Sequence, residues 1–116
     1  MTKSPESVRC GWCHRPLAQS AGAGRPRQFC GPSHRQRAYE ARRRAEVLRI
    51  PTGHCIVAEE DLRRLHDRLY RLEAAVEDVT SDLCDDARPA AYRRAYEHLL
   101  DAAVDLAGMV VVPARE

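Results

Sequence analysis

A long repeat of apolar positions runs through the second half of the chain. Charged residues fill most of the positions between them. The repeat has alternating spacings of three and four residues over about three heptads, at Leu62, Leu65, Leu69, Leu72, Val76, Val79 and Leu83. Such a heptad seam predicts one long amphipathic helix over residues 57–85, of the kind that packs lengthwise against another helix.

A second apolar seam follows a short break. The segment 85–89 interrupts the first pattern, and its last residue, Pro89, favours the first position of a new helix. The new seam consists of Tyr92, Tyr96, Leu99, Ala103, Leu106 and Val110. Because the connection is short, the two helices should be antiparallel neighbours. Residues 58–116 are therefore expected to form a coiled-coil-like helical hairpin, and the fold class is expected to be mostly α.

A single hairpin of two helices buries little apolar surface, so it needs a further partner. Leu100 and Val104 flank the second seam and widen its apolar face. We expect two copies of the chain to associate through their hairpins into a dimeric four-helix bundle. The alternative is that the hairpin packs on the N-terminal part of its own chain.

The first fifty residues contain few apolar side chains but two spaced pairs of metal-ligand residues. The pattern is Cys10-x2-Cys13-x16-Cys30-x3-His34. Zinc prefers four tetrahedral ligands drawn from thiolate and imidazole, and a C-x2-C turn brings two sulfurs to one ion. The second pair stands just before a helix-forming run over 35–49. We therefore predict one zinc ion per chain, bound by a small knuckle at the start of this helix.

The number and type of these ligands also indicate what the metal does. An iron–sulfur cluster is the main chemical alternative, but the histidine and the absence of a fourth nearby cysteine disfavour it. A catalytic zinc keeps an open coordination position, whereas four protein ligands close the shell. The site should be structural.

Residues 10–44 resemble small bacterial zinc-finger proteins of the form CxxCxxxL…GRPRxYCSxxCRxRAxR. The resemblance rests on Cys10-Gly-Trp-Cys13-His-Arg-Pro-Leu17, Gly24-Arg-Pro-Arg27-Gln-Phe-Cys30 and Arg35-Gln-Arg-Ala38. It implies a knuckle like that of a treble clef or zinc ribbon, in a protein that binds DNA. This sequence departs from the pattern at the fourth ligand, where His34 replaces a cysteine; both donors suit zinc. The helical hairpin lies outside the resemblance.

The net charge of +2 conceals a strong asymmetry along the chain. Residues 1–49 carry eleven Lys or Arg against three acidic residues, a balance of +8, whereas residues 50–116 carry eight Arg against fourteen acidic residues, a balance of −6. A basic N-terminal half suggests a polyanionic partner. The arginines expected to contact phosphate are Arg25, Arg27, Arg35, Arg37, Arg42, Arg43, Arg44 and Arg49.

These observations favour a zinc-dependent nucleic-acid-binding protein, with duplex DNA preferred over RNA and a role in transcription regulation. Guanidinium groups bind phosphate bidentately and stay charged at physiological pH. The alternative is a protein-interaction adaptor, in which the acidic hairpin docks a partner protein and the zinc is purely structural. No catalytic triad, phosphate-binding glycine loop or paired-carboxylate pocket is recognisable, so we expect no enzymatic activity.

The remaining sequence features concern organisation and location. We expect a zinc-binding basic module over 1–50, a linker over 51–57, where His54 and Cys55 have no second ligand pair, and the acidic hairpin over 58–116. The polar start of the chain lacks the apolar core of a signal peptide, and no apolar run is long enough to cross a bilayer. A cytoplasmic location, with reduced thiols and no membrane partner, is therefore expected.

Overall fold

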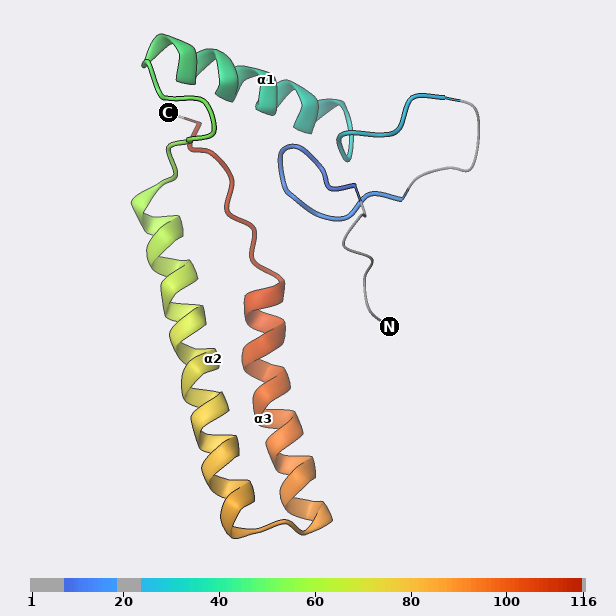
Figure 1. The fold of residues 1–116 in the computed structure, drawn as a ribbon, viewed down its shortest axis with the longest axis vertical. Helices are drawn as coiled ribbons and strands as arrows, with labels where there is room; N and C mark the ends of the chain where they lie inside the picture. The colour runs from blue at the N-terminus through green and yellow to red at the C-terminus, as the bar shows by residue number, and fades with distance from the viewer. Residues whose placement is uncertain (1–7, 19–23, 116) are drawn as a thin grey trace. The chain divides into compact units, whose positions relative to one another are not determined.

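The computed structural model describes residues 8–18 and 24–115, and within these ranges the protein is built from three helices (Figure 1). They are α1 (Pro32–Val47), α2 (Glu59–Asp85) and α3 (Pro89–Ala107). The described residues contain no strand, and their only β-type pairing is an isolated bridge between Arg9 and Pro16. The expected mostly-α fold is confirmed.

The chain divides into two compact units that are not contiguous in sequence. The first unit spans Met1–Val57 and Val112–Glu116, and the second spans Ala58–Val111. Two hydrogen bonds of Ala114 hold the C-terminal segment within the first unit. The Ala114 amide donates to the Ile56 carbonyl at 2.8 Å, and the Arg44 guanidinium donates to the Ala114 carbonyl at 2.6 Å.

The second unit is a helical hairpin, with α2 and α3 packed side by side in antiparallel directions (Figure 1). The prediction extended the hairpin to residue 116, but residues 112–116 belong to the first unit. The buried residues of the hairpin are all alanines, which let the two helices approach closely: Ala75, Ala91, Ala95 and Ala102. Pro89 stands at the first position of α3, as its fixed φ favours. None of the helices in the described ranges is long and apolar enough to cross a membrane.

The heptad seam of α2 is split between two environments. Leu65, Leu72 and Val79 are half-buried, whereas Leu62, Leu69 and Val76 keep 40%, 42% and 48% of their surface exposed. Leu83 is half-buried as well. The hairpin alone therefore leaves three of the seven seam residues exposed.

Helix α1 begins three residues before the predicted run 35–49 and ends two residues before Arg49. Leu48 is the C-cap, and Arg49 adopts a left-handed conformation with φ of 58°. The amides of Arg49 and Ile50 donate to the carbonyls of Glu46 and Ala45, at 3.2 and 2.9 Å. This is the hydrogen-bond pattern of a Schellman motif, which terminates the helix.

Candidate metal centre

The first pair of metal-ligand residues lies in a tight turn over 8–17. Backbone hydrogen bonds close the turn: Leu17 N donates to Val8 O at 2.8 Å, and Cys10 N donates to Arg15 O at 2.9 Å. Within it, His14 N donates to Cys10 O at 3.0 Å and His14 has a positive φ of 63°. This reversal of the chain brings the side chains of Cys10 and Cys13 to the same side.

The second pair is placed by the start of α1. Cys30 lies two residues before the helix, and His34 lies in its first turn. A hydrogen bond of 2.9 Å from Gly11 N to Gln28 O joins the two ligand-bearing segments. Gly11 is required here for space, since a Cβ at this position would lie 2.8 Å from the Phe29 ring.

All four predicted ligands converge. The ligand atoms of Cys10, Cys13, Cys30 and His34 lie within 4.8 Å of one another. Cys10 Sγ is 3.6 Å from His34 Nδ1, and Cys13 Sγ is 3.5 Å from Cys30 Sγ. Ligand bonds of about 2.0–2.3 Å arranged tetrahedrally around zinc give ligand–ligand separations of roughly 3.3–3.8 Å. The group is therefore positioned to hold one metal ion, as predicted.

The surroundings of Cys10 favour a thiolate. Its side chain is only 1% exposed, and the amides of Trp12 and Cys30 each donate to its sulfur at 3.4 Å. Burial raises the pKa of Cys10, but hydrogen bonds from the Cys13, Trp12 and Cys30 backbone and from His34 outweigh it and lower the pKa from 9.0 to about 5. The thiolate is the form that ligates metal.

Cys30 is affected in the opposite direction. Its hydrogen bond with the Cys13 thiol, then burial and the nearby Cys10, raise its pKa to about 11. Three sulfurs this close cannot all ionise at low cost without a cation between them. Three thiolates and one imidazole form a soft donor set that suits zinc rather than calcium or magnesium. The residues present therefore fit a closed structural zinc site.

Two aromatic residues support the site, and the sequence analysis did not assign them a role. Trp12, between the two cysteines of the turn, is only 4% exposed, and Phe29 precedes Cys30 and lies against Gly11. Their positions next to Cys13 and Cys30 in the sequence are the signal that could have indicated this role.

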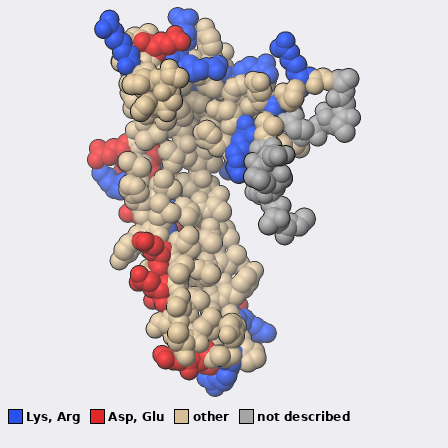
Figure 2. Space-filling model, in the orientation of Figure 1, with Lys and Arg blue, Asp and Glu red and all other residues tan. Residues whose placement is uncertain are grey.

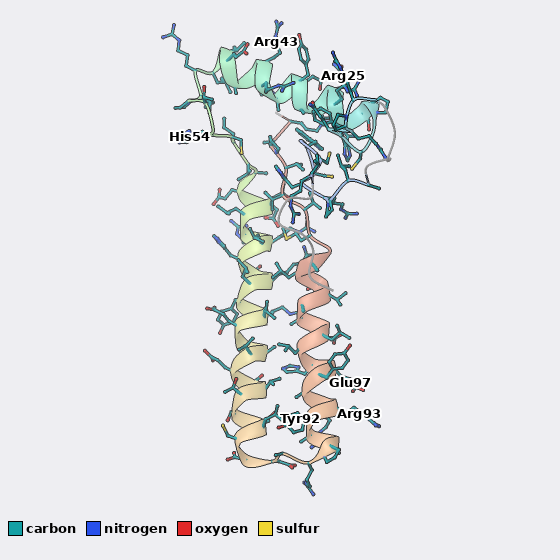
Figure 3. All side chains as sticks on the ribbon, turned by 45° about the vertical axis from the view of Figure 1, so that its right-hand side comes forward. Arg25, Arg43, His54, Tyr92, Arg93 and Glu97 are labelled. Carbon is teal, nitrogen blue, oxygen red and sulfur yellow. The ribbon has the colours of Figure 1, made fainter. Side chains whose placement is uncertain are left out.

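The eight predicted phosphate-binding arginines fall into different environments. Arg35, Arg42 and Arg43 are exposed along α1, and Arg37 and Arg44 on the same helix are half-buried. Arg25 and Arg27 are exposed in the loop before α1, and Arg49 is exposed beyond its C-terminus. Figure 3 shows Arg25 and Arg43 on the first unit.

Two of these arginines already bind backbone carbonyls. Arg27 donates to Cys30 O at 2.6 Å, next to the metal ligands, and Arg44 donates to Ala114 O at the same distance. Both therefore help to shape the first unit.

The exposed face of α1 also carries a tyrosine that the sequence analysis did not select. Tyr39 is 48% exposed, and the Arg43 guanidinium lies 6.0 Å from the centre of its ring. Arg43 Nη1 also donates to the Tyr39 hydroxyl at 3.4 Å. Tyr39 and Arg43 therefore contact each other on the exposed face of α1.

The remaining cysteines do not form a second metal site. Cys55 and Cys84 are free and exposed. Across the described ranges, the cluster of Cys10, Cys13, Cys30 and His34 is the one group of at least three ligand-type residues close enough to hold an ion. His54 Nδ1 lies 3.4 Å from the Thr52 carbonyl instead.

No protein-family model, no curated protein and no solved structure matches this chain. The functional argument therefore rests on the geometry of the site and the chemistry of its residues.

Proposed function

We propose that this protein is a zinc-dependent DNA-binding regulator that dimerises through its hairpin. The observation that carries this proposal is the position of α1, which starts at the Cys3His cluster and presents arginines on its exposed face. In its 16 residues α1 has five arginines against two glutamates, and no acidic residue in its first turn. In this proposal a bound zinc ion fixes the first turn of the helix.

The exposed face of α1 has the chemistry of a phosphate-binding surface. Arg35 and Arg42 are seven residues apart and therefore lie on the same face, next to Arg43 and Tyr39. Arginine forks bind phosphate oxygens, and a tyrosine can donate a hydrogen bond to phosphate or stack on a base. Figure 2 shows Lys and Arg side chains gathered over the first unit, whereas acidic side chains follow α2.

The side chains on the exposed face of α1 favour binding to phosphate over recognition of particular bases. Contacts to phosphate fix the register of a protein on a duplex without reading its sequence. The loop arginines on either side of Pro26 would add contacts, and a minor groove is a favourable place for such side chains. Any sequence preference would come from the few residues that reach the base edges.

The two faces of the hairpin support dimerisation, because they differ sharply. On one face polar contacts connect the helices: Arg68 and Arg71 form ion pairs with Asp105 at 3.6 and 2.6 Å, and His98 forms a hydrogen bond with Asp78 at 3.3 Å. The helical periodicity places the exposed apolar residues on the opposite face. They are Leu62, Leu69, Val76, Tyr92, Tyr96 and Leu100, each at least 40% exposed.

A second copy of the chain is the partner that we propose for this apolar face. Figure 2 shows a largely uncharged hairpin surface with acidic side chains at the α2 margin. Two such faces would bury each other and complete the four-helix bundle that a hairpin with an all-alanine buried core lacks. A dimer would also place two basic modules on one duplex, and so raise its affinity.

The DNA-binding proposal is tested by fluorescence anisotropy with a labelled random-sequence duplex and zinc-loaded protein at several salt concentrations. The test variant replaces Arg35, Arg42 and Arg43 with Gln, and the matched control replaces the exposed hairpin residues Arg63, Arg64 and Arg93 with Gln. Both lose three charges. We expect the α1 variant to lose at least tenfold in affinity at low salt and about 2–3 in the slope of log K against log salt.

The control separates the helix surface from the overall charge of the protein. Equal losses in both variants, or no binding by the parent protein at low salt, would contradict the proposal. In the second case the apolar face would favour the adaptor function, in which the hairpin docks a different protein and the zinc module is only structural. Sedimentation of the parent protein would then show a monomer free to bind that partner.

A further inference from the structure

The first unit contains a cavity that has no role in the candidate metal site or in the DNA-binding proposal. Its volume is about 380 Å³, within the range of about 300–1,000 Å³ that small-molecule sites occupy. Three parts of the unit line it: the ligand-bearing segments with Trp12 and Phe29, the inner face of α1, and the segment around Ile56 together with Pro113 and Ala114. All of these residues belong to the same compact unit.

The walls of the cavity are mostly apolar. The inner face of α1 contributes three alanines one turn apart, which leave room where larger side chains would fill it: Ala38, Ala41 and Ala45. Leu48 and Ile56, which also line it, remain 53% and 49% exposed. Apolar side chains around an open space of this size favour a ligand with an apolar body.

The polar groups in the wall are basic or neutral, and no Asp or Glu is among the lining residues. Arg42 and Arg44 contribute from α1, and His54 contributes an imidazole. Arg44 is held in position by its 2.6 Å hydrogen bond to the carbonyl of Ala114, which lines the same cavity. This bond uses one of the five N–H groups of a guanidinium.

We propose that this cavity binds a small organic anion, a carboxylate attached to an aromatic or aliphatic body. The body would lie against Trp12, Ala41 and Ile56, and the carboxylate would interact with Arg42 and Arg44. The arrangement of an apolar pocket with a few convergent charged groups is the usual form of such sites. Binding of this ligand does not require the DNA-binding function.

One consequence does rest on that function. Arg42 belongs both to the cavity wall and to the exposed face of α1, so a bound carboxylate would compete with phosphate for it. The ligand would then lower the affinity for DNA. The binding test uses no nucleic acid, so the two proposals can fail separately.

The test uses the zinc-loaded full-length protein and three probes in two-dimensional ¹H–¹⁵N NMR titrations. The probes are 4-phenylbutyrate, its neutral amide, and acetate, which has the charge without the apolar body. The chain has a single tryptophan, so the indole N–H signal of Trp12 reports on the cavity wall directly. We expect saturable shifts of this signal with 4-phenylbutyrate, weaker binding of the amide by threefold to fivefold, and none with acetate.

Two variants and one control variant locate the site. Arg42→Gln should weaken 4-phenylbutyrate threefold to fivefold without changing the affinity for the amide, whereas Arg43→Gln, one residue further along α1 and outside the cavity lining, should leave both affinities unchanged. Ala41→Leu fills the space and should weaken both probes at least tenfold. Bound zinc is measured in each variant, so that loss of folding is recognised; if Ala41→Leu fails to fold, the two arginine variants decide.

The proposal would be overturned by any of three results. The Trp12 signal could fail to shift with 4-phenylbutyrate at millimolar concentration. The amide could bind as tightly as the acid, or the shifts could lie only on the hairpin signals of residues 58–111.

Discussion

At the scale of single residues, Cys10 is the centre of the candidate metal site. It is the most buried side chain of the cluster, and two backbone amides donate to its sulfur in addition to the contact with His34. These hydrogen bonds come from both ligand-bearing segments. The Cys10 sulfur therefore joins the turn over 8–17 to the start of α1 even before any ion is considered.

Replacing Cys10 with Ala should remove the bound zinc. The variant loses one ligand of four and the acceptor for two amides, so zinc content should fall from one equivalent to less than about 0.2 after gel filtration at neutral pH. The measurement is elemental analysis together with the fluorescence of Trp12, which should become more solvent-exposed. Cys55→Ala is the control, since Cys55 is exposed and outside the cluster, and it should keep one equivalent. Full zinc retention by the Cys10 variant would rule out the proposed site.

At the scale of the elements, the end of α1 and the connection between α2 and α3 each depend on one residue. The C-terminus of α1 needs a left-handed residue, and Arg49 supplies it although glycine is preferred there. The connection between α2 and α3 instead depends on one carboxylate. Asp86 accepts hydrogen bonds from the backbone and side chain of Arg88 and lies 4.0 Å from Arg94.

Arg49→Gly should stabilise the first unit. Glycine removes the strain of a positive φ, and we expect the free energy of unfolding to rise by about 0.5–1 kcal/mol. Urea unfolding followed by Trp12 fluorescence measures this change, because Trp12 belongs to the same unit. Arg43→Gly, in the interior of α1, should have the opposite effect, a loss of about 1 kcal/mol. A loss of stability in both variants would show that the left-handed position carries no strain.

Asp86→Asn should destabilise the hairpin in a pH-dependent way. The side-chain and backbone hydrogen bonds from Arg88 lower the pKa of Asp86 from 3.8 to about 2. A carboxylate with a depressed pKa stabilises the fold above its unfolded pKa, and this stability is lost as the pH falls through the folded value. The parent protein should therefore be more stable than the variant at pH 6, and the difference should close between about pH 4 and pH 2.

Thermal unfolding followed by far-ultraviolet circular dichroism gives this comparison. Asp85→Asn removes the same charge one residue earlier and should produce a much smaller difference at pH 6. A difference between Asp86→Asn and the parent that persists unchanged at pH 2 would contradict the role of the ionised carboxylate.

At the scale of the whole molecule, the two units use different means to stay folded. Among the described residues of the first unit only Cys10, Trp12, Cys13 and Ala38 are buried, so its core is very small. The second unit has continuous helices with an alanine-lined contact, and it leaves one apolar face exposed.

The dimer proposal gives a prediction on that face. Leu69→Glu puts a charge at the centre of the exposed apolar residues and should weaken dimerisation at least tenfold. Ser81→Glu adds the same charge on the outer side of α2 and should leave the dimer intact. Sedimentation equilibrium should give about twice the chain mass of 13.1 kDa for the parent protein and for Ser81→Glu. A monomeric parent protein across the micromolar range would exclude the dimer.

The sequence predicted those features that leave a periodic or spaced pattern. The heptad seam predicted α2, Pro89 predicted the start of α3, and the spacing of the cysteines and His34 predicted the cluster. It could not predict how the C-terminal segment joins the first unit, because hydrogen bonds between main-chain groups do not depend on residue type. The sequence pattern also gave no reason to distinguish the arginines of α1 from one another. The contact of Arg44 with Ala114 distinguishes it, and Ala114 is seventy positions away in the sequence.

The hydrogen bond between Ala114 and Ile56 has a consequence for the architecture of the gene product. Since it brings together the points where the chain leaves the first unit and returns to it, the hairpin is an insertion within a loop of the metal-binding module. The residues at which the chain enters and leaves the hairpin lie close together. A short turn or another inserted element could therefore replace the hairpin and connect the same two points of the first unit. The two units can therefore vary independently in sequence and length, because the hairpin can be replaced without breaking the chain within the first unit.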